Sequence, residues 1–557
     1  MRKLDVVLAA AVGAVVLLTW LPRLTGPIDL RWDGGVYYVL GTALADGRGY
    51  RLLNEPGEIE ADQYPPLFPA IIALHQRLAG TSDPTVVGRW LRLTFMLQSI
   101  GLGLAAYALF RRRLAPGLAV LGALVLMLHP VTIFVSDIAF SDLTFTVLTV
   151  SFFVVYGKDE RSWSREALAG LLAVAAFLVR TTGIALLVAW VAGGLLSRRF
   201  RVAAVRLALV LPFVLGWQIH VAAVERGRSY TAPSYAYQRA DYLFYNVSYA
   251  RNYMLRDPER PEAGRLSVAG LAERLARNLS TVPHNTGEAI SAQRDDWRKP
   301  TRALSRLPGI GGLFRLRLVD VALVLLGSLA LTGLVIQYLG GDTVMPLYVL
   351  LSIGIICLTP VSWSYRYWFS LAPMMIVGLS HFCAWVQRVL ETHEWRRALW
   401  WGPRLVLAGV GVVLSVQVVS LFDLFHERHQ PVVYRDLRGQ TVSYRLFYYR
   451  DTYRALDAAI DWLREEAPDG AIIATSMPHW VYLRSGFKAV MPPFERDPVT
   501  ALRLLEGVPV SYLVVDGRTF SPTREFGLPA VRLAPNRWES VFSDVEGEVE
   551  IFRRVTP

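Results

Sequence analysis

The chain has 557 residues, of which 53% are hydrophobic and only 19% charged, and its mean hydropathy is +0.34. This charged fraction is below that of typical soluble domains, and the apolar residues form long uncharged blocks, so the composition excludes both a simple soluble enzyme and a disordered chain. The net charge of +12 suits a nucleic-acid binder, but also a membrane protein whose basic loops set its orientation. The composition and the blocks together indicate a polytopic membrane protein.

Eleven blocks approach the 20 or so mostly apolar residues that cross a bilayer. They are 4–21, 86–110, 114–130, 141–156, 167–180, 182–197, 203–220, 317–338, 343–360, 367–388 and 400–424. The first begins like a signal peptide but lacks a clear small-residue cleavage site, so we interpret it as a membrane anchor. Both cysteines, Cys357 and Cys383, fall in these blocks, and no disulfide framework is implied.

Basic residues predict the orientation. If every block crosses once, the basic clusters share one side, which is then cytoplasmic: Arg2–Lys3, Arg111–Arg113, Lys158–Arg165, Arg198–Arg201 and Arg388–Arg397. The apolar stretch 66–79 must then lie at the outer interface without crossing. The preference for Arg over Lys suggests a GC-rich bacterial genome. We expect an inner-membrane protein with a cytoplasmic N-terminus and an extracytoplasmic C-terminus.

Three segments are expected outside the membrane. The first is the loop 22–85. The second, 221–316, holds a tyrosine-rich run at 230–253 and an amphipathic helical pattern at 271–279. The tail after residue 425 alternates helical and strand patterns, at 452–466, 471–475, 499–506 and 512–515, which predicts a small α/β domain. The predicted domains are therefore a membrane domain, 1–425, and an outer domain, 426–557, in which we expect His479 at the surface.

The first outer loop carries the most informative motif. Asp33 follows the first span, in the run Asp29-Leu-Arg-Trp-Asp-Gly-Gly-Val-Tyr37-Tyr38, and a short helix is expected over 36–45. Gly47-Arg-Gly-Tyr50 and Gln63-Tyr64-Pro65-Pro66 come next, and the paired prolines should start the interface helix near Leu67.

This loop resembles the first outer loop of the GT-C glycosyltransferases, the group that contains protein O-mannosyltransferases and the lipid A aminoarabinose transferase. Weaker similarities follow in the same order over roughly residues 1–380: His129-Pro130 with Ser136-Asp137 and Ser141-Asp142, then Arg180-Thr-Thr-Gly183, then Ser364-Tyr365-Arg366-Tyr367 with Pro373. Two positions depart from the pattern. Gly34 stands where many relatives have a second acidic residue, and Tyr64 stands where the aminoarabinose transferase has Lys.

The resemblance implies a GT-C fold and an inverting hexosyl- or pentosyltransferase that takes sugar from a polyprenyl-phosphate donor. The acceptor would be a hydroxyl of a glycan, lipid or protein outside the membrane. Asp33 is the expected general base because a hydroxyl must lose its proton as it attacks. Arg180 and Arg366, together with Tyr365, are expected to bind the donor phosphate, since guanidinium groups match phosphate geometry.

Four further residues are expected to bind substrate or acceptor: Asp137, Asp142, Tyr37 and Tyr64. The scheme needs no cofactor and no metal, and the sequence shows no His/Cys/Asp cluster at metal spacing. No nucleic-acid partner is expected. Neither the sugar nor the acceptor can be identified from these motifs.

Each residue also has a structural interpretation. Asp33 and Asp142 could cap the helices that follow them, and Asp137 could be a solvated loop residue. The arginines could pair with acidic neighbours or lipid headgroups. Tyr37 and Tyr64 could be interfacial packing residues, and the tyrosine-rich run at 230–253 is either an aromatic belt or a rim of the substrate site. For the whole chain, the alternatives are a transporter or a non-catalytic glycan-binding or assembly protein. Acids and arginines gathered at the outer ends of spans favour surface chemistry over ion-coupled transport.

Overall fold

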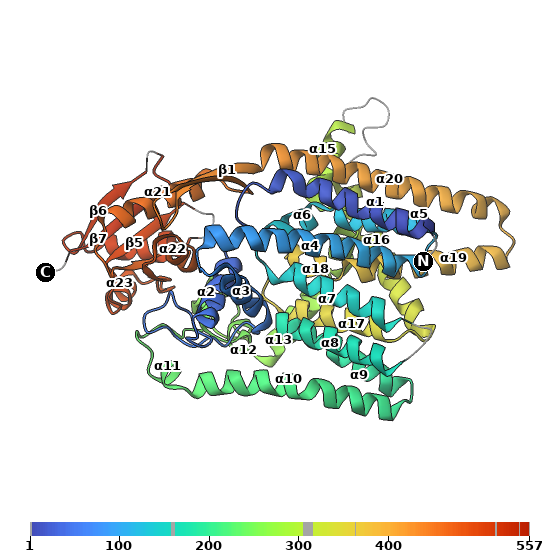
Figure 1. Cartoon of the computed structure of the whole chain (residues 1–557), viewed down its shortest axis with the longest axis horizontal. Helices are drawn as coiled ribbons and strands as arrows, with labels where there is room; N and C mark the ends of the chain where they lie inside the picture. The colour runs from blue at the N-terminus through green and yellow to red at the C-terminus, as the bar shows by residue number, and fades with distance from the viewer. Residues whose placement is uncertain are drawn as a thin grey trace.

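The computed structural model describes residues 3–157, 162–304, 316–361, 364–517, 521–544 and 546–555. Its long helices run side by side, and a C-terminal α/β domain covers one end of the helical bundle (Figure 1). The N-terminus and the turns from α9 to α10 and from α19 to α20 lie at the opposite end (Figure 1). Arg2 and residues 158–161, which belong to the predicted basic set, lie outside the described residues.

Every block that the sequence marks as a span is largely helical. Within the described ranges, five helices are long and apolar enough to cross a membrane: α1 (Lys3–Trp20), α4 (Pro84–Arg111), α10 (Phe200–Arg226), α16 (Leu316–Leu339) and α20 (Arg396–Glu427). Shorter apolar helices are α3 (Leu67–Ala79), α7 (Ser141–Tyr156), α9 (Ile184–Leu196) and α17 (Val344–Leu358), and the bundle also holds α8 (Trp163–Val179) and α19 (Ala372–Thr392). The expected number of eleven spans is not confirmed.

The third apolar block is broken. It consists of α5 (Pro116–Met127) and α6 (Pro130–Asp137), which meet at an angle of 57° and would count as a sixth span if they cross together. Pro130 cannot continue the hydrogen bonds of α5 but suits the first turn of a new helix. His129 caps that turn by accepting from the Val131 N–H.

The two outer loops form short helices. The first outer loop forms η1 (Leu21–Arg23), α2 (Asp33–Ala45) and α3. The second forms α11 (Arg228–Thr231), η3 (Phe244–Asn246), α12 (Tyr249–Tyr253), η4 (Pro261–Ala263), α13 (Val268–Leu279), α14 (Val282–Ala289) and α15 (Arg294–Leu304). The helical pattern at 271–279 is confirmed in α13. Short outer connections are η2 (Thr181–Gly183) and α18 (Tyr365–Phe369).

The tail is an α/β domain, as its alternating pattern predicts. A hairpin of β1 (His429–Arg435) and β2 (Thr441–Phe447) precedes a five-stranded sheet of order β4-β3-β5-β7-β6. Its strands are β3 (Ile472–Ala474), β4 (Lys488–Val490), β5 (Tyr512–Asp516), β6 (Trp538–Ser543) and β7 (Val549–Arg554). Strands β4, β3 and β5 are parallel, while β7 runs antiparallel to β5 and β6. The helices are α21 (Asp451–Glu466), α22 (Pro478–Ser485), α23 (Pro498–Glu506), the π-helical η6 (Thr523–Gly527) and α24 (Leu528–Arg532).

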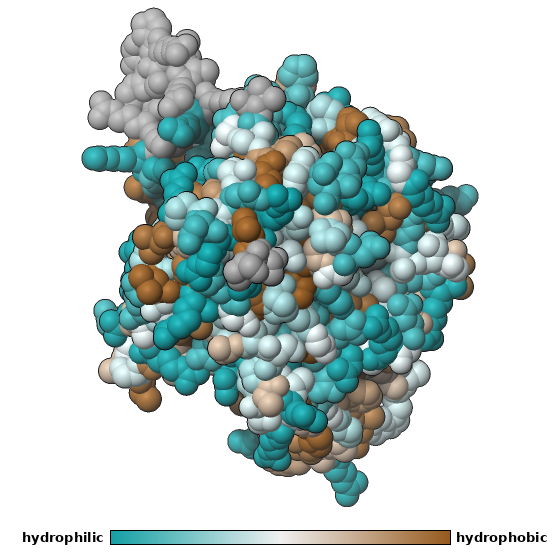
Figure 2. Space-filling model, turned by 90° about the vertical axis from the view of Figure 1, so that its left-hand side faces the viewer, coloured by the Kyte–Doolittle hydropathy of each residue, from teal (hydrophilic) through white to brown (hydrophobic). Residues whose placement is uncertain are grey.

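The C-terminal domain is joined to the first outer loop by buried polar contacts. Buried Arg31 pairs with Asp29 at 2.6 Å and donates to the backbone carbonyls of Phe447, at 2.7 Å, and Tyr448, at 3.1 Å. The Asn54 side-chain amide donates to the carbonyl of Ala489, the middle residue of β4, and the Ala489 N–H donates to the Asn54 backbone carbonyl. These contacts hold the domain against both flanks of α2. Its outer surface, seen end-on, is dominated by hydrophilic side chains (Figure 2).

Candidate active site

Asp33 is the first residue of α2, and the backbone before it is strained. Trp32, the N-cap, has φ 53° and ψ −129°, a conformation that non-glycine residues rarely adopt. Its ring packs near Phe140 and Tyr453. No side-chain cap bond closes this helix end. Asp33 therefore does not act as the N-cap, and its carboxylate is turned to other partners.

Two carboxylates and two arginines form a chain of ion pairs around Asp33. One nitrogen of Arg366, Nη2, lies 2.9 Å from both Asp33 Oδ2 and Asp142 Oδ2. The other oxygen of Asp142 lies 2.8 Å from Arg180 Nη1. The four formal charges of the group cancel. Burial opposes the charge of Arg366, but Asp142 and Asp33 outweigh it and raise its pKa.

The elements bring these residues together from distant parts of the sequence. Asp142 is the second residue of α7, and Arg180 ends α8 where the chain turns into η2. Arg366 lies on α18, a single turn between α17 and α19, and its guanidinium stacks over Phe140 at 3.6 Å. The site therefore forms where several apolar helices end on the side of the C-terminal domain.

A cavity of about 260 Å³ opens beside this group. Asp33, Arg180 and Arg366 line it together, so three of the residues expected to act on donor and acceptor share one space. Its other walls combine aliphatic side chains with tyrosine rings and several hydroxyl groups. They include Tyr37, Tyr64, Phe145, Phe244, Tyr249, Tyr253, Tyr348, Ser352, Ile355, Ile356, Tyr367 and Leu371.

Tyr37 and Tyr64, both expected at the site, form one wall of the cavity. Their rings are 4.6 Å apart, and the Tyr37 hydroxyl shares a 2.9 Å hydrogen bond with Ser141. The buried Tyr64 hydroxyl has no hydrogen-bond partner among the described residues. This hydroxyl is available to a bound molecule.

Two predicted site residues do not reach this cavity. Asp137 is not a solvated loop residue but is buried at the end of α6, 3.3 Å from Arg92 and 3.9 Å from Arg23. These pairs join α4, α6 and η1, and Asp137 does not line the cavity. Its geometry is that of a structural ion pair.

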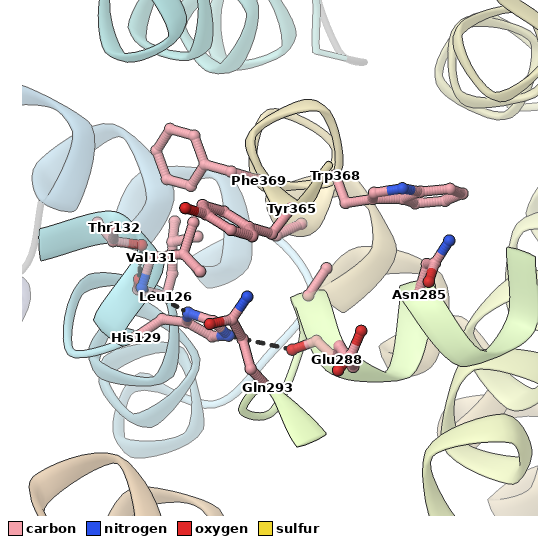
Figure 3. Close-up of a pocket in the computed structure, with 12 residues that line it drawn as sticks. Leu126, His129, Val131, Thr132, Asn285, Glu288, Gln293, Tyr365, Trp368 and Phe369 are labelled. Carbon is pink, nitrogen blue, oxygen red and sulfur yellow. Dashed lines mark hydrogen bonds between the residues drawn. The ribbon is translucent and has the colours of Figure 1, made fainter. Parts of the chain in front are cut away.

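Tyr365 faces the opposite side of α18. It lines a small cavity of about 20 Å³ together with His129 and Trp368 (Figure 3). His129 uses both ring nitrogens there, one on Val131 and one on the Glu288 carbonyl. Tyr367, two residues further along α18, lines the larger cavity in place of Tyr365.

The tyrosine-rich run supplies a contact to Asp33 that the sequence did not identify. The Tyr245 hydroxyl donates to Asp33 Oδ1 at 3.0 Å. Burial raises the pKa of Tyr245 well above its usual value of 10, so this hydroxyl stays protonated and donates. Tyr249 and Tyr253 line the cavity, and this part of the run is therefore a rim of the site. Its tyrosine density was the one available signal.

The expectation that His479 lies at the surface is wrong. This side chain is 4% exposed and packs edge-on against Tyr245, with the ring centroids 5.0 Å apart. The pattern before α22 gave no sign of burial, because the partner surface comes from residues more than 200 positions away. Among the residues that the structure describes, no group of three or more His, Cys, Asp or Glu is placed to hold a metal ion.

Comparison with known proteins identifies solved structures of the same fold. No family model and no curated protein matches the sequence. The archaeal oligosaccharyltransferase AglB from Archaeoglobus fulgidus, in complex with an inhibitory peptide and a dolichol-phosphate, matches 100% of this chain with a TM-score of 0.54. The identity is 12%, and the match covers 74% of that chain.

Two further solved structures are similar. The apo form of the same oligosaccharyltransferase has a TM-score of 0.53 at 12% identity, covering 100% of this chain and 75% of that one. ArnT from Cupriavidus metallidurans bound to undecaprenyl phosphate covers 98% of both chains at 15% identity, with a TM-score of 0.44. The chain thus has the fold of the GT-C oligosaccharyltransferase, and the GT-C fold expected from the sequence is confirmed.

Proposed function

We propose that this protein is a membrane glycosyltransferase that moves a sugar from a polyprenyl-phosphate-linked donor to an acceptor hydroxyl outside the membrane. The observation that carries the proposal is the shared cavity of Asp33, Arg180 and Arg366. A base and two phosphate-binding groups meet there at the ends of apolar helices. The dolichol-phosphate bound by the oligosaccharyltransferase of the same fold supports a lipid-phosphate ligand.

Donor binding would free the base. In the structure Arg366 is shared between Asp33 and Asp142, while its Nε–H has no partner among the described residues. A phosphate entering the cavity competes for this guanidinium and for Arg180 with charge-assisted hydrogen bonds. As Arg366 turns to the phosphate, Asp33 loses an ionic partner and becomes free to accept a proton. Asp142 then holds the two arginines in place, a role that differs from the expected acceptor contact.

The transfer step needs only these groups. The acceptor oxygen attacks the anomeric carbon as its proton passes to the Asp33 carboxylate. The bond from that carbon to the phosphate oxygen breaks, and the lipid phosphate leaves as an anion stabilised by Arg180 and Arg366. Attack opposite the leaving group inverts the anomeric configuration. Tyr37 and Tyr64 would flank the sugar, and no metal or organic cofactor takes part in this scheme.

The aliphatic wall of the cavity suits the first units of a polyprenyl chain. Ile355 and Ile356 of α17 and Leu371 face the same space as the arginines. A lipid whose phosphate lies on the arginines could thus bury its tail among membrane helices. We place the protein in a bacterial inner membrane with the N-terminus cytoplasmic and the C-terminal domain on the outer side.

The test is a transfer assay of the purified protein with a panel of polyprenyl-phosphate sugars, wild type beside Asp33→Asn. We expect turnover of a donor by the wild type and a loss of about 100-fold or more in the variant, within the usual range for general acid–base catalysis. Tyr365→Phe is the matched control, because Tyr365 faces the other cavity. Absence of turnover and of donor-dependent thermal stabilisation across the panel would contradict the proposal.

A further inference from the structure

A histidine of the C-terminal domain reaches the hydrogen-bond partner of Asp33. The imidazole of His479 meets the Tyr245 ring edge-on at 87°. Tyr245 in turn donates to Asp33. His479 lies outside the cavity lining, so it acts on a bound molecule only through its neighbours. The contacts therefore run from His479 to Tyr245 and from Tyr245 to Asp33.

The topology of the C-terminal sheet explains this reach. Strand β3 ends at Ala474, and Pro478 begins α22 four residues later, so His479 projects beyond the carboxyl edge of the parallel strands. This edge is where open α/β sheets usually place functional side chains. Here it faces the first turn of α2.

A glycine permits the close approach. A Cβ on Gly35, two residues after Asp33, would lie 3.0 Å from His479 Cβ and 3.0 Å from the Leu30 carbonyl oxygen. Any side chain at this position would push α22 away from α2. The same histidine therefore contacts the helix that carries Asp33 and the tyrosine that binds Asp33.

The imidazole is present as a neutral group. Burial lowers the pKa of His479 to about 3, and its Nε2 has no hydrogen-bond partner among the described residues. Its contribution at this contact is thus shape and packing. A ring of this size fixes the Tyr245 ring in one orientation.

The structure assigns His479 as a positioning residue that couples the docked C-terminal domain to Asp33 through Tyr245. The assignment rests on the proposed transfer function. It makes the C-terminal domain part of the catalytic centre, in addition to any contact that the domain makes with the acceptor. By fixing the Tyr245 hydroxyl, His479 keeps the Asp33 carboxylate aimed into the cavity.

The experiment is a double-mutant cycle in the full-length protein, with His479→Ala, Tyr245→Phe and the double variant. We expect His479→Ala to lower kcat about fivefold to tenfold, with the donor KM changed less than twofold, because misorientation of a catalytic group costs rate. In the Tyr245→Phe background, where the hydrogen bond is already absent, the same substitution should cost less than twofold. His479→Phe keeps a ring against Tyr245 and should retain more than half of the wild-type kcat.

Additive losses in the cycle, or full activity of His479→Ala, would overturn the assignment. A His479→Ala variant that fails to fold is replaced by His479→Leu, which fills the site without an aromatic edge and carries the same expectations. A second readout does not depend on turnover. Fluorotyrosine placed at position 245 should give one sharp ¹⁹F signal in the wild type and in His479→Phe, and a broadened or split signal in His479→Ala.

These readouts separate the two proposals. If the wild type transfers no sugar, the proposed function fails, while the ¹⁹F spectra still test whether His479 fixes Tyr245. An unchanged spectrum in His479→Ala would overturn the positioning role even in an active enzyme.

Discussion

In the free protein the Asp33 carboxylate has two partners of different kinds, and these partners determine whether it can accept a proton. Arg366 stabilises its charge, while Tyr245 fixes the direction of one oxygen. A base that kept both bonds would be poorly available to a hydroxyl. The proposed exchange of Arg366 from Asp33 to the donor phosphate resolves this, because it makes proton transfer follow donor binding.

The shape of the Arg366 side chain should matter as well as its charge. Lysine keeps the charge but offers a single ammonium in place of a planar fork, so it cannot bind a phosphate through two parallel N–H groups. We expect Arg366→Lys to lower kcat/KM for the donor at least about tenfold, equivalent to about 1.4 kcal/mol of transition-state stabilisation. The measurement is steady-state transfer kinetics beside Tyr365→Phe, and equal loss in both variants would contradict the assignment.

The sequence identifies a residue as a site candidate where an ionisable side chain stands at the end of an apolar block. Asp33, Arg180 and Arg366 stand at the ends of apolar blocks, where a charge needs a reason to be buried. Tyr245 and His479 were not predictable, because their significance lies in contacts between segments far apart in the sequence. Asp137 differs, since a motif predicted it at the site, whereas in the structure it pairs with Arg92 and Arg23 and does not line the cavity.

At the level of elements, the apolar blocks predict helices well, while the number that cross the membrane is not confirmed. The block at 114–130 contains the bend between α5 and α6, and the block at 367–388 begins inside the single turn α18. Hydropathy measures how apolar a stretch is but not where it bends. The bend before Pro130 nevertheless has a local signal, since proline suits the start of a helix and not its interior. The alternating pattern of the tail was the most accurate prediction of elements.

The ion pairs of Asp137 should hold elements together and not act on substrate. Asp137→Ala leaves two buried arginines without their carboxylate, which typically costs about 3 to 5 kcal/mol of unfolding free energy. We expect a marked fall in thermal stability in detergent, with kcat per folded molecule changed less than about twofold. A loss of kcat in a protein of unchanged stability would place Asp137 in the catalytic machinery.

At the scale of the whole molecule, the α/β domain docks on the first outer loop next to Asp33, and none of its described residues lines the cavity. Arg31, Asn54 and Gly35 of the first outer loop all contact it, and these residues flank Asp33 in the sequence. The sequence predicted a domain of this class but not the surface on which it docks, because docking surfaces carry no periodic pattern. The fold therefore packs the outer domain against the loop and helix that carry Asp33.

The buried histidine makes this docking sensitive to acid. In the unfolded chain His479 takes up a proton near pH 6.5, while in the folded protein burial lowers its pKa to about 3. The unfolded state therefore binds more protons between these values. The stability contribution of the neutral histidine is complete above pH 6.5 and is lost progressively as the pH falls towards 3.

His479→Phe removes this titration and keeps the ring. We expect the wild type to lose unfolding free energy relative to His479→Phe by about 1.4 kcal/mol per pH unit below pH 6.5. Denaturant titrations in detergent at several pH values measure the difference, in which the other titrating groups largely cancel. If the unfolding free energies of the two proteins depend on pH in the same way, the histidine is solvated in the folded protein.

The most direct test of the account asks whether Asp33 serves only to remove a proton. Azide is an anion and needs no base, so it should restore donor cleavage to Asp33→Ala, in which the hydroxyl acceptor reacts slowly. We predict formation of a glycosyl azide of inverted anomeric configuration by Asp33→Ala, with the polyprenyl phosphate released in equal amount. Failure of azide to restore cleavage in a folded variant that still binds the donor would contradict the assignment of Asp33 as the base.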